Sequence, residues 1–114
     1  MIDVQKAVIM NRDKYLTLLR SKTAKFFPDH WDFPRGKLEP NEKPIDGIIR
    51  EVKEETNLDI VPDNVVGQYT MEIKGIPHRF TIYSVKSFFG KIMLTHEHQE
   101  YKWLTKKEIC VILK

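Results

Sequence analysis

The sequence predicts an α+β domain in which helices cover both faces of a mixed central sheet, forming an α/β/α sandwich. Two observations lead to this prediction. Runs rich in β-branched and aromatic residues flank one amphipathic segment, and a second helical segment comes at the end of the chain. The length of 114 residues falls within the usual size of one domain, so residues 1–114 are expected to share a single core.

Two β-hairpins are expected. The runs VQKAVIM (4–10) and KYLTLLR (14–20) are separated by NRD, which suits a turn. The runs at 65–74 and 78–89 flank GIP and predict a second hairpin. Between the first hairpin and the central helix, residues 21–37 combine two prolines with mixed chemistry, which favours a long functional loop.

The central helix is predicted to begin at Pro44 and to end at Asn57. Proline fits the first helical turn, and asparagine tolerates the left-handed conformation that ends many helices. Four apolar residues recur at helical spacing and share one arc, which should pack against a core. These residues are Ile45, Ile48, Ile49 and Val52.

The last elements are a short strand at 100–105 and a helix at 106–114. Thr105 and Glu108 have the spacing of a capping box, which predicts where this helix begins. The chain stops after only about two helical turns. We therefore expect either that the C-terminal helix is truncated or that this end is weakly held.

Composition narrows the class of protein. Apolar residues make up 41% and charged residues 31%, which is ordinary for a soluble globular domain. No apolar run approaches a membrane span, the start lacks a signal-peptide pattern, and the single Cys110 fits a reducing compartment, so a cytoplasmic location is expected. The net charge of +3 is too small to indicate a nucleic-acid partner, but it favours a polyanionic ligand such as a phosphate ester.

The central helix carries a cluster of like charges. Glu51, Glu54 and Glu55 lie three and four residues apart, so they share one face and repel one another. Arg50 can relieve only part of this repulsion, and a hard cation such as magnesium would relieve the rest. Gly47, one turn earlier, would leave space for a metal or a phosphate. The alternative is an ordinary solvated acidic face.

A wider motif surrounds these glutamates. This stretch resembles the Nudix box in residue types and spacing at every fixed position except one. The matching residues are Gly36, Glu42 and the segment REVKEETNL (50–58). At the position that differs, Asn57 replaces a glycine, and asparagine is the next-best residue for a left-handed helix stop. The resemblance implies the Nudix fold, an α/β/α sandwich, which agrees with the strands on both sides of the box.

The resemblance also implies a metal-dependent hydrolase that cleaves a diphosphate bond with Mg²⁺ or Mn²⁺ as cofactor. Water would attack a phosphorus atom, with Glu54 preferred for positioning or deprotonating it. Arg50 would orient a glutamate, and Glu42 would buttress the junction of loop and helix. The implied metal ligands are Glu51, Glu54, Glu55 and the backbone carbonyl of Arg35.

A distant acid commonly completes such a site. The segment THEHQEYKW offers Glu97 and Glu100, and Glu97 matches the usual place better, although it could equally be an ordinary loop acid. His96 and His98 flank it and suggest a transition-metal pair. Two histidines alone make a weak site, so we expect them near the mouth of the pocket and not as ligands.

Candidate substrate-binding residues lie outside the acidic cluster. A basic residue at Arg35 resembles the form found in dinucleoside-polyphosphate hydrolases and messenger-RNA decapping enzymes, and it could hold a further phosphate or be an exposed loop residue. Three aromatic residues before the box could stack a base or fill the core. They are Phe26, Phe27 and Trp31. Arg79 could reach a phosphate or cover a strand edge.

The leading functional hypothesis is a pyrophosphohydrolase of nucleoside triphosphates or related small nucleotides, because the chain is compact. Dinucleoside polyphosphates follow closely, and ADP-ribose and RNA 5′ ends stay open, although RNA should require a broad basic track that the sequence lacks. The rival from another class is a catalytically silent Nudix-fold sensor, which would be expected to lose glutamates that this sequence keeps. Many family members are dimers, so a homodimer is one assembly that the resemblance allows.

Overall fold

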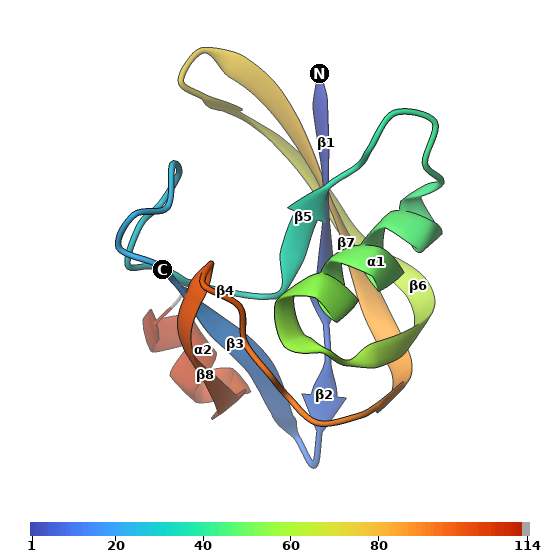
Figure 1. The fold of residues 1–114 in the computed structure, drawn as a ribbon, viewed down its shortest axis with the longest axis vertical. Coiled ribbons are helices and arrows are strands. Elements are labelled where there is room, and N and C mark those ends of the chain that lie inside the picture. The colour runs from blue at the N-terminus through green and yellow to red at the C-terminus, as the bar shows by residue number, and fades with distance from the viewer. Residues whose placement is uncertain (113–114) are drawn as a thin grey trace.

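The computed structural model describes residues 1–112, which form an α+β sandwich of two sheets and two helices (Figure 1). The mixed sheet runs in the order β5 (Arg35–Lys37), β1 (Ile2–Val8), β7 (Ile76–Phe89) and β6 (Asp59–Ile73). In the antiparallel second sheet, β3 (Lys14–Arg20) pairs with β2 (Met10–Asn11), β4 (Trp31–Asp32) and β8 (His98–Thr105). The helices are α1 (Pro44–Thr56) and α2 (Lys106–Ile112).

The hairpin predicted for the first two runs forms only at its tip. Met10 and Asn11 pair with β3 across a turn in which Arg12 and Asp13 have φ angles of 50° and 65°. Most of the first run lies instead in β1, which pairs in parallel with β7 and antiparallel with β5. The prediction was wrong for β1, because an apolar run indicates burial but does not identify the partner strand.

The second predicted hairpin is confirmed. β6 and β7 pair antiparallel around Lys74 and Gly75, whose positive φ angles of 52° and 79° suit a tight hairpin turn. β6 begins at Asp59, earlier than expected, and register shifts between Val61 and Gly67 accommodate Pro62 within the strand. The expected loop at 21–37 is also partly regular, because it contains β4 and β5.

The central helix matches its prediction at both ends. Pro44 begins α1, and Asn57 ends it in the left-handed conformation, with φ of 68°. Ile48 and Val52 are fully buried, but Ile45 is 50% exposed, because it stands in the first turn, ahead of the part of the helix that faces the core.

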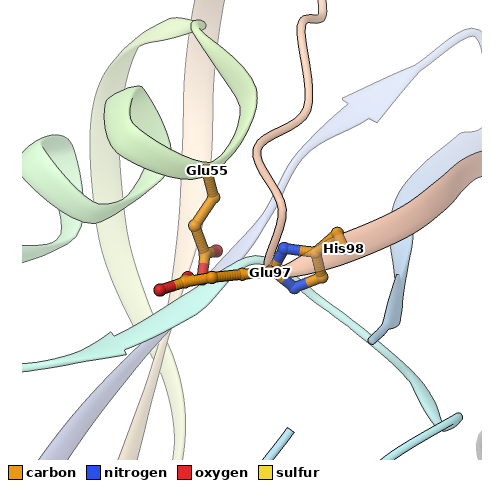
Figure 2. A group of neighbouring side chains, drawn as sticks. All are labelled: Glu55, Glu97 and His98. Atoms are coloured by element: carbon orange, nitrogen blue, oxygen red, sulfur yellow. The ribbon is translucent and has the colours of Figure 1, made fainter. Parts of the chain in front are cut away.

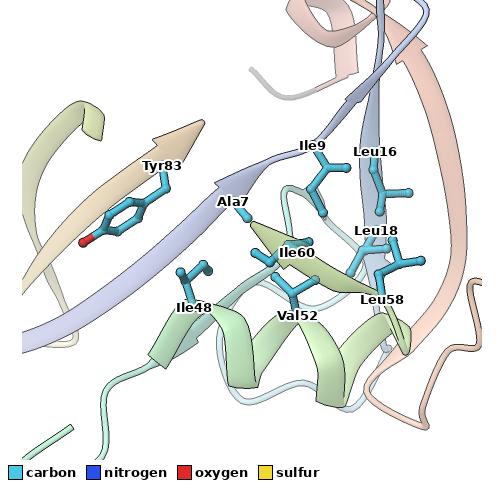
Figure 3. Packing of buried hydrophobic residues seen from close by; sticks show 9 residues of the cluster. All are labelled: Ala7, Ile9, Leu16, Leu18, Ile48, Val52, Leu58, Ile60 and Tyr83. Carbon is cyan, nitrogen blue, oxygen red and sulfur yellow. The ribbon is translucent and has the colours of Figure 1, made fainter. Parts of the chain in front are cut away.

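The main hydrophobic core lies between α1 and strands of both sheets (Figure 3). It therefore fixes the position and rotation of α1 relative to the two sheets, and with them the positions of the glutamates that the helix carries. The core residues are Ala7, Ile9, Leu16, Leu18, Ile48, Val52, Leu58, Ile60 and Tyr83.

At the C-terminal end, the predicted strand is confirmed and extends back to His98. The capping box is also present. The Glu108 carboxylate accepts from the backbone N–H of Thr105 at 3.0 Å, and the Thr105 hydroxyl accepts from the N–H of Glu108 at 3.3 Å. The last two residues of the predicted helix lie outside the described part of the chain. Neither described helix is long and apolar enough to cross a membrane.

The side chain of Arg50 links α1 to the loop before it. Its Nε and Nη2 donate to the Glu42 carboxylate at 2.7 and 2.9 Å, and Nη2 also donates to the carbonyl of Lys37 at 3.1 Å. The backbone N–H of Glu39 donates to the same carboxylate at 3.0 Å. The Arg50 guanidinium, with help from this N–H, lowers the pKa of Glu42 to about 2.

We predict that Glu42→Gln lowers the melting temperature at neutral pH but has little effect in strong acid. The folded-state pKa of about 2 lies below the ordinary 4.5, so the ionised carboxylate stabilises the fold above pH 4.5. This stabilisation is lost as the pH falls through the folded-state pKa. Thermal unfolding of both proteins at decreasing pH measures the difference.

The matched control is Glu72→Gln, which removes the charge of an exposed glutamate on β6. Its effect on melting temperature should be small across the same range. A deficit in Glu42→Gln that stays constant down to the lowest pH at which the protein is folded would contradict the assigned ion pair.

Candidate functional site

A cavity of about 540 Å³ brings together side chains from separate parts of the chain. Glu51 and Glu55 reach it from α1, and Glu97 reaches it from the loop before β8. Arg20, at the end of β3, and Arg35, in β5, line the same cavity. Acidic and basic groups therefore share one space, which suits a ligand that carries both phosphates and cations.

Glu55 is the most buried acid of the cavity, with 4% of its surface exposed. Burial raises its pKa well above the usual range, and the charges of Glu51 and Glu97 act in the same direction. The backbone N–H of Arg35 donates to Glu55 Oε1 at 3.1 Å, but no lysine or arginine side chain in residues 1–112 forms an ion pair with it. The Glu55 carboxylate therefore lacks a close counter-charge.

Glu51 lies directly over the glycine that begins the box. A Cβ atom on Gly36 would come within 1.9 Å of Glu51 Cδ, so this position must lack a side chain for Glu51 to lie there. Burial also raises the pKa of Glu51, although Arg50 opposes this through a hydrogen bond of 2.8 Å. Gly36 and Arg50 together hold the carboxylate at the cavity wall.

Glu54 lies differently from its two neighbours on the helix. Its side chain is 57% exposed, it accepts from Arg50 Nη1 at 3.2 Å, and it does not line the cavity. The space expected beside Gly47 is also filled, because a Cβ atom there would come within 2.4 Å of Leu38 and 3.1 Å of Glu42. Gly47 therefore permits close packing of the loop on α1 and leaves no room for a metal or phosphate.

The loop before β8 places Glu97, and not Glu100, at the cavity. The carbonyl of Glu97 accepts from the backbone N–H of Ser21 at 3.0 Å, which ties this loop to the segment after β3. Glu100 lies within β8, with its carboxylate 3.8 Å from Lys102 Nζ. The sequence-based choice between the two acids thus agrees with their positions.

The two histidines beside Glu97 occupy different environments. His96 is exposed and lines the cavity, as expected, whereas His98 is only 8% exposed and does not stand at the mouth. Burial lowers the pKa of His98 to about 4, and the positive charges of Arg20 and Arg35 add to the effect. Strand pairing explains the difference, because β8 begins at His98, opposite Arg20 of β3.

Arg35 is a half-buried residue of β5, which disagrees with the alternative of an exposed loop arginine. Its side chain is 12% exposed, its Nη1 lies 3.4 Å from the Asp32 carboxylate, and its guanidinium lies 5.8 Å from the ring centre of Phe27. Arg20 lies nearby and donates from Nε to the carbonyl of Phe26 at 2.9 Å. Burial lowers the pKa of Arg20, and the charge of Arg35 contributes.

A second cavity of about 390 Å³ adjoins the first, because Arg20, Arg35 and Phe80 line both. Phe27 and Trp31 contribute to the second cavity, whereas Phe26 lines the first. Arg79 lines neither of them. It pairs with Asp3 at 2.7 Å across the neighbouring strands β1 and β7.

Sequence reasoning missed Arg20 and the ion pair between Lys6 and Asp32. Lys6 is buried in β1, and its Nζ donates to both Asp32 oxygens at 3.0 and 3.1 Å beside the second cavity. Arg20 is the last residue of an apolar strand, where a terminal charge is ordinary. Neither residue belongs to a motif, so only the pairing of the strands brings them to the site.

The cavity fits a divalent cation on the chemistry of its residues. Carboxylate oxygens are the ligands that magnesium and manganese prefer, and Glu51, Glu55 and Glu97 supply them from two sides. Figure 2 shows the side chains of Glu55 and Glu97 meeting beside His98. One ligand atom each from Glu55, Glu97 and His98 lie within 4.8 Å of one another. A cation there would neutralise the buried charge of Glu55.

Comparison with known proteins gives relatives with named activities. The chain is 28% identical over 87 residues to the asymmetrical bis(5′-nucleosyl)-tetraphosphatase of Mus musculus, covering 71% of this chain and 59% of that protein. It is 29% identical over 108 residues to the CTP pyrophosphohydrolase of Escherichia coli, covering 95% and 78%.

Structural comparison agrees. The crystal structure of a MutT protein from Methanosarcina mazei superimposes with a TM-score of 0.90 at 31% identity, over 96% of this chain and 80% of that one. The family model described as NUDIX domain matches residues 3–114, almost the entire sequence. With Gly36, Glu51 and Glu55 of the box lining one cavity, these findings show that the chain belongs to the Nudix domain family.

Proposed function

We propose that this protein is a metal-dependent pyrophosphohydrolase that cleaves the diphosphate linkage of a small nucleotide. One observation supports this most strongly: three carboxylates, from α1 and from the loop before β8, line a single cavity together with two arginines. Carboxylates that hold cations and guanidinium groups that hold phosphates are the two requirements of phosphoric anhydride hydrolysis.

Mg²⁺ or Mn²⁺ is the proposed cofactor. Glu51, Glu55 and Glu97 would hold it at the cavity, together with the backbone carbonyl of Arg35, whose N–H already binds Glu55. When bound, the metal supplies charge neutralisation on the diphosphate and makes a water molecule more acidic. Glu54 lies outside the cavity beside Arg50, so in its proposed role of positioning water it would act from the exposed edge of α1.

The protein's own groups would divide the remaining work. Arg20 and Arg35 would orient the phosphates, since a guanidinium group forms strong, directional hydrogen bonds with phosphate oxygens. Phe27 and Trp31 would contact the nucleoside in the second cavity. Arg79, paired with Asp3, would reach the substrate only if that ion pair opened. One such arrangement places the scissile linkage beside the carboxylates and the base beyond the arginines.

Nucleoside triphosphates are the substrates we favour, with water attacking a phosphorus atom of the linkage. Dinucleoside polyphosphates form the second candidate class, because Arg20 and Arg35 line both cavities and could follow a longer phosphate chain. The tetraphosphatase relative supports the second class, and the CTP pyrophosphohydrolase relative supports the first. ADP-ribose and RNA 5′ ends are the remaining substrate candidates, and a catalytically silent nucleotide sensor is the non-enzymatic alternative.

The test is turnover of a nucleotide panel with and without divalent metal. In Mg²⁺ or Mn²⁺ we expect a nucleoside triphosphate to yield a shorter nucleotide with phosphate or pyrophosphate, or a dinucleoside polyphosphate to yield two mononucleotides. Neither reaction should occur after chelation with EDTA. Glu54→Gln should lower turnover by roughly 10²–10⁴-fold, the usual contribution of a residue that positions or deprotonates the attacking group.

Glu72→Gln, on the exposed face of β6, is the matched charge-removing control and should retain normal turnover. A folded protein that binds nucleotides but hydrolyses none of the panel in either metal would favour the sensor. Full activity in Glu54→Gln would instead show that another carboxylate positions the water.

Gly36→Ala tests the placement of Glu51. The new methyl group would occupy the position of the Glu51 carboxylate, whose flexible side chain can move aside, so the melting temperature should change little. Turnover should fall by roughly 10²-fold, the cost of displacing a positioned group by about 1 Å. The control is Gly67→Ala, where the nearest atom to the new Cβ lies at 3.5 Å. Equal turnover in the two variants would argue against a role for Glu51.

Arg35→Ala tests the contact with the phosphate chain. We expect the KM for a dinucleoside tetraphosphate to rise by roughly 10- to 100-fold, the range of one charge-assisted hydrogen bond, and the KM for a triphosphate to rise less. Arg12→Ala, in the exposed turn after β2, is the control. Because Arg35 also pairs with Asp32, thermal unfolding of the variant must accompany the kinetics. An equal rise for both substrates would contradict the assignment.

A further inference from the structure

His98 is a buried imidazole that the family resemblance leaves without a role. Its side chain is more than nine-tenths buried, and its Nδ1 atom has no hydrogen-bond partner among residues 1–112. An unsatisfied buried polar atom is uncommon in folded proteins and requires an explanation such as a bound ion. The backbone position of His98 is set by strand pairing, because β8 begins at His98 and this residue pairs with Arg20 of β3.

The imidazole lies close to two carboxylates of the cavity, those of Glu55 and Glu97. One ligand atom each from Glu55, Glu97 and His98 all lie within 4.8 Å of one another. Atoms that share one cation at about 2.0–2.3 Å lie at most about 4.6 Å apart, so side-chain adjustments of a few tenths of an ångström would complete such a site. Figure 2 shows the three side chains approaching one space from α1 and from the start of β8.

We propose that His98 is a nitrogen ligand of the metal centre, beside Glu55 and Glu97. This inference rests on the proposed function, because it assigns a further ligand to the same cation. It also changes the expected metal. Magnesium prefers oxygen ligands, whereas imidazole favours first-row transition metals, so a centre with His98 selects ions such as Mn²⁺, Co²⁺ or Zn²⁺ over Mg²⁺.

A hydrogen bond offers the competing explanation. His98 could donate to one of the carboxylates and only position it, in which case the ring nitrogen would stay outside the coordination shell. The two arrangements differ in a property that does not depend on turnover, namely whether a ¹⁴N nucleus is bonded directly to the metal.

The experiment loads the full-length protein with Mn²⁺ alone and records electron spin-echo modulation. Wild type should show coupling to a directly bound ¹⁴N, which changes to ¹⁵N coupling when histidine is labelled. His98→Gln should lose this coupling and bind Mn²⁺ at least about 10-fold more weakly, while Mg²⁺ affinity, measured by calorimetry, changes less.

The matched control is His96→Gln, which removes the exposed histidine of the same loop and should keep the nitrogen coupling. If His98→Gln fails to fold, His96→Gln and His78→Gln, which remove the two histidines that line the cavity, decide the question by keeping the nitrogen coupling. Mn²⁺ bound to wild type without nitrogen coupling would overturn the inference and leave the pyrophosphohydrolase intact. Absence of any Mn²⁺ or Mg²⁺ binding would instead contradict the proposed function itself.

Discussion

The arrangement of α1 depends on the ion pairs and hydrogen bonds of the Arg50 guanidinium. It pairs with Glu42 and the Lys37 carbonyl on the loop and with Glu51 and Glu54 on the helix. One cation thus offsets the repulsion among neighbouring acids and also fastens the loop to the helix. Arg50 holds Glu54 on the exposed side and Glu51 at the cavity wall, whereas Glu55 lies beyond its reach. Arg50 therefore neutralises the acidic residues of the helix only in part.

The incomplete neutralisation of the acids has a counterpart among the basic residues of the cavity. Arg20 and Arg35 are both partly buried, and burial together with the charge of Arg35 lowers the pKa of Arg20. Their partners are only partial, since Arg20 donates from Nε to a backbone carbonyl and Arg35 shares Asp32 with Lys6. A cavity with one under-neutralised wall of each sign is complementary to a polyanion bound together with a cation. Neither ligand alone would satisfy both walls.

The sequence predicted the parts of the fold and site that depend on local spacing. Pro44, Asn57 and the capping box at Thr105 fix element ends through backbone chemistry, and the box fixes which helical positions are acidic. The pairing of β1 with β7 could not be predicted, because an apolar run fits more than one partner. The same limit hid Arg20 and the burial of His98, since both depend on the pairing of β3 with β8.

Glu55 shows why a site of this kind costs stability until its ligand binds. Its pKa is higher in the folded protein than in the unfolded chain, so the unfolded chain releases the proton first as the pH rises. Ionisation above the ordinary pKa of 4.5 therefore favours unfolding, in contrast to Glu42, whose lowered pKa makes ionisation stabilising. The two glutamates differ in their partners: Glu42 pairs with Arg50 and stabilises the fold, whereas Glu55 has no such pair and keeps a buried carboxylate available for a cation.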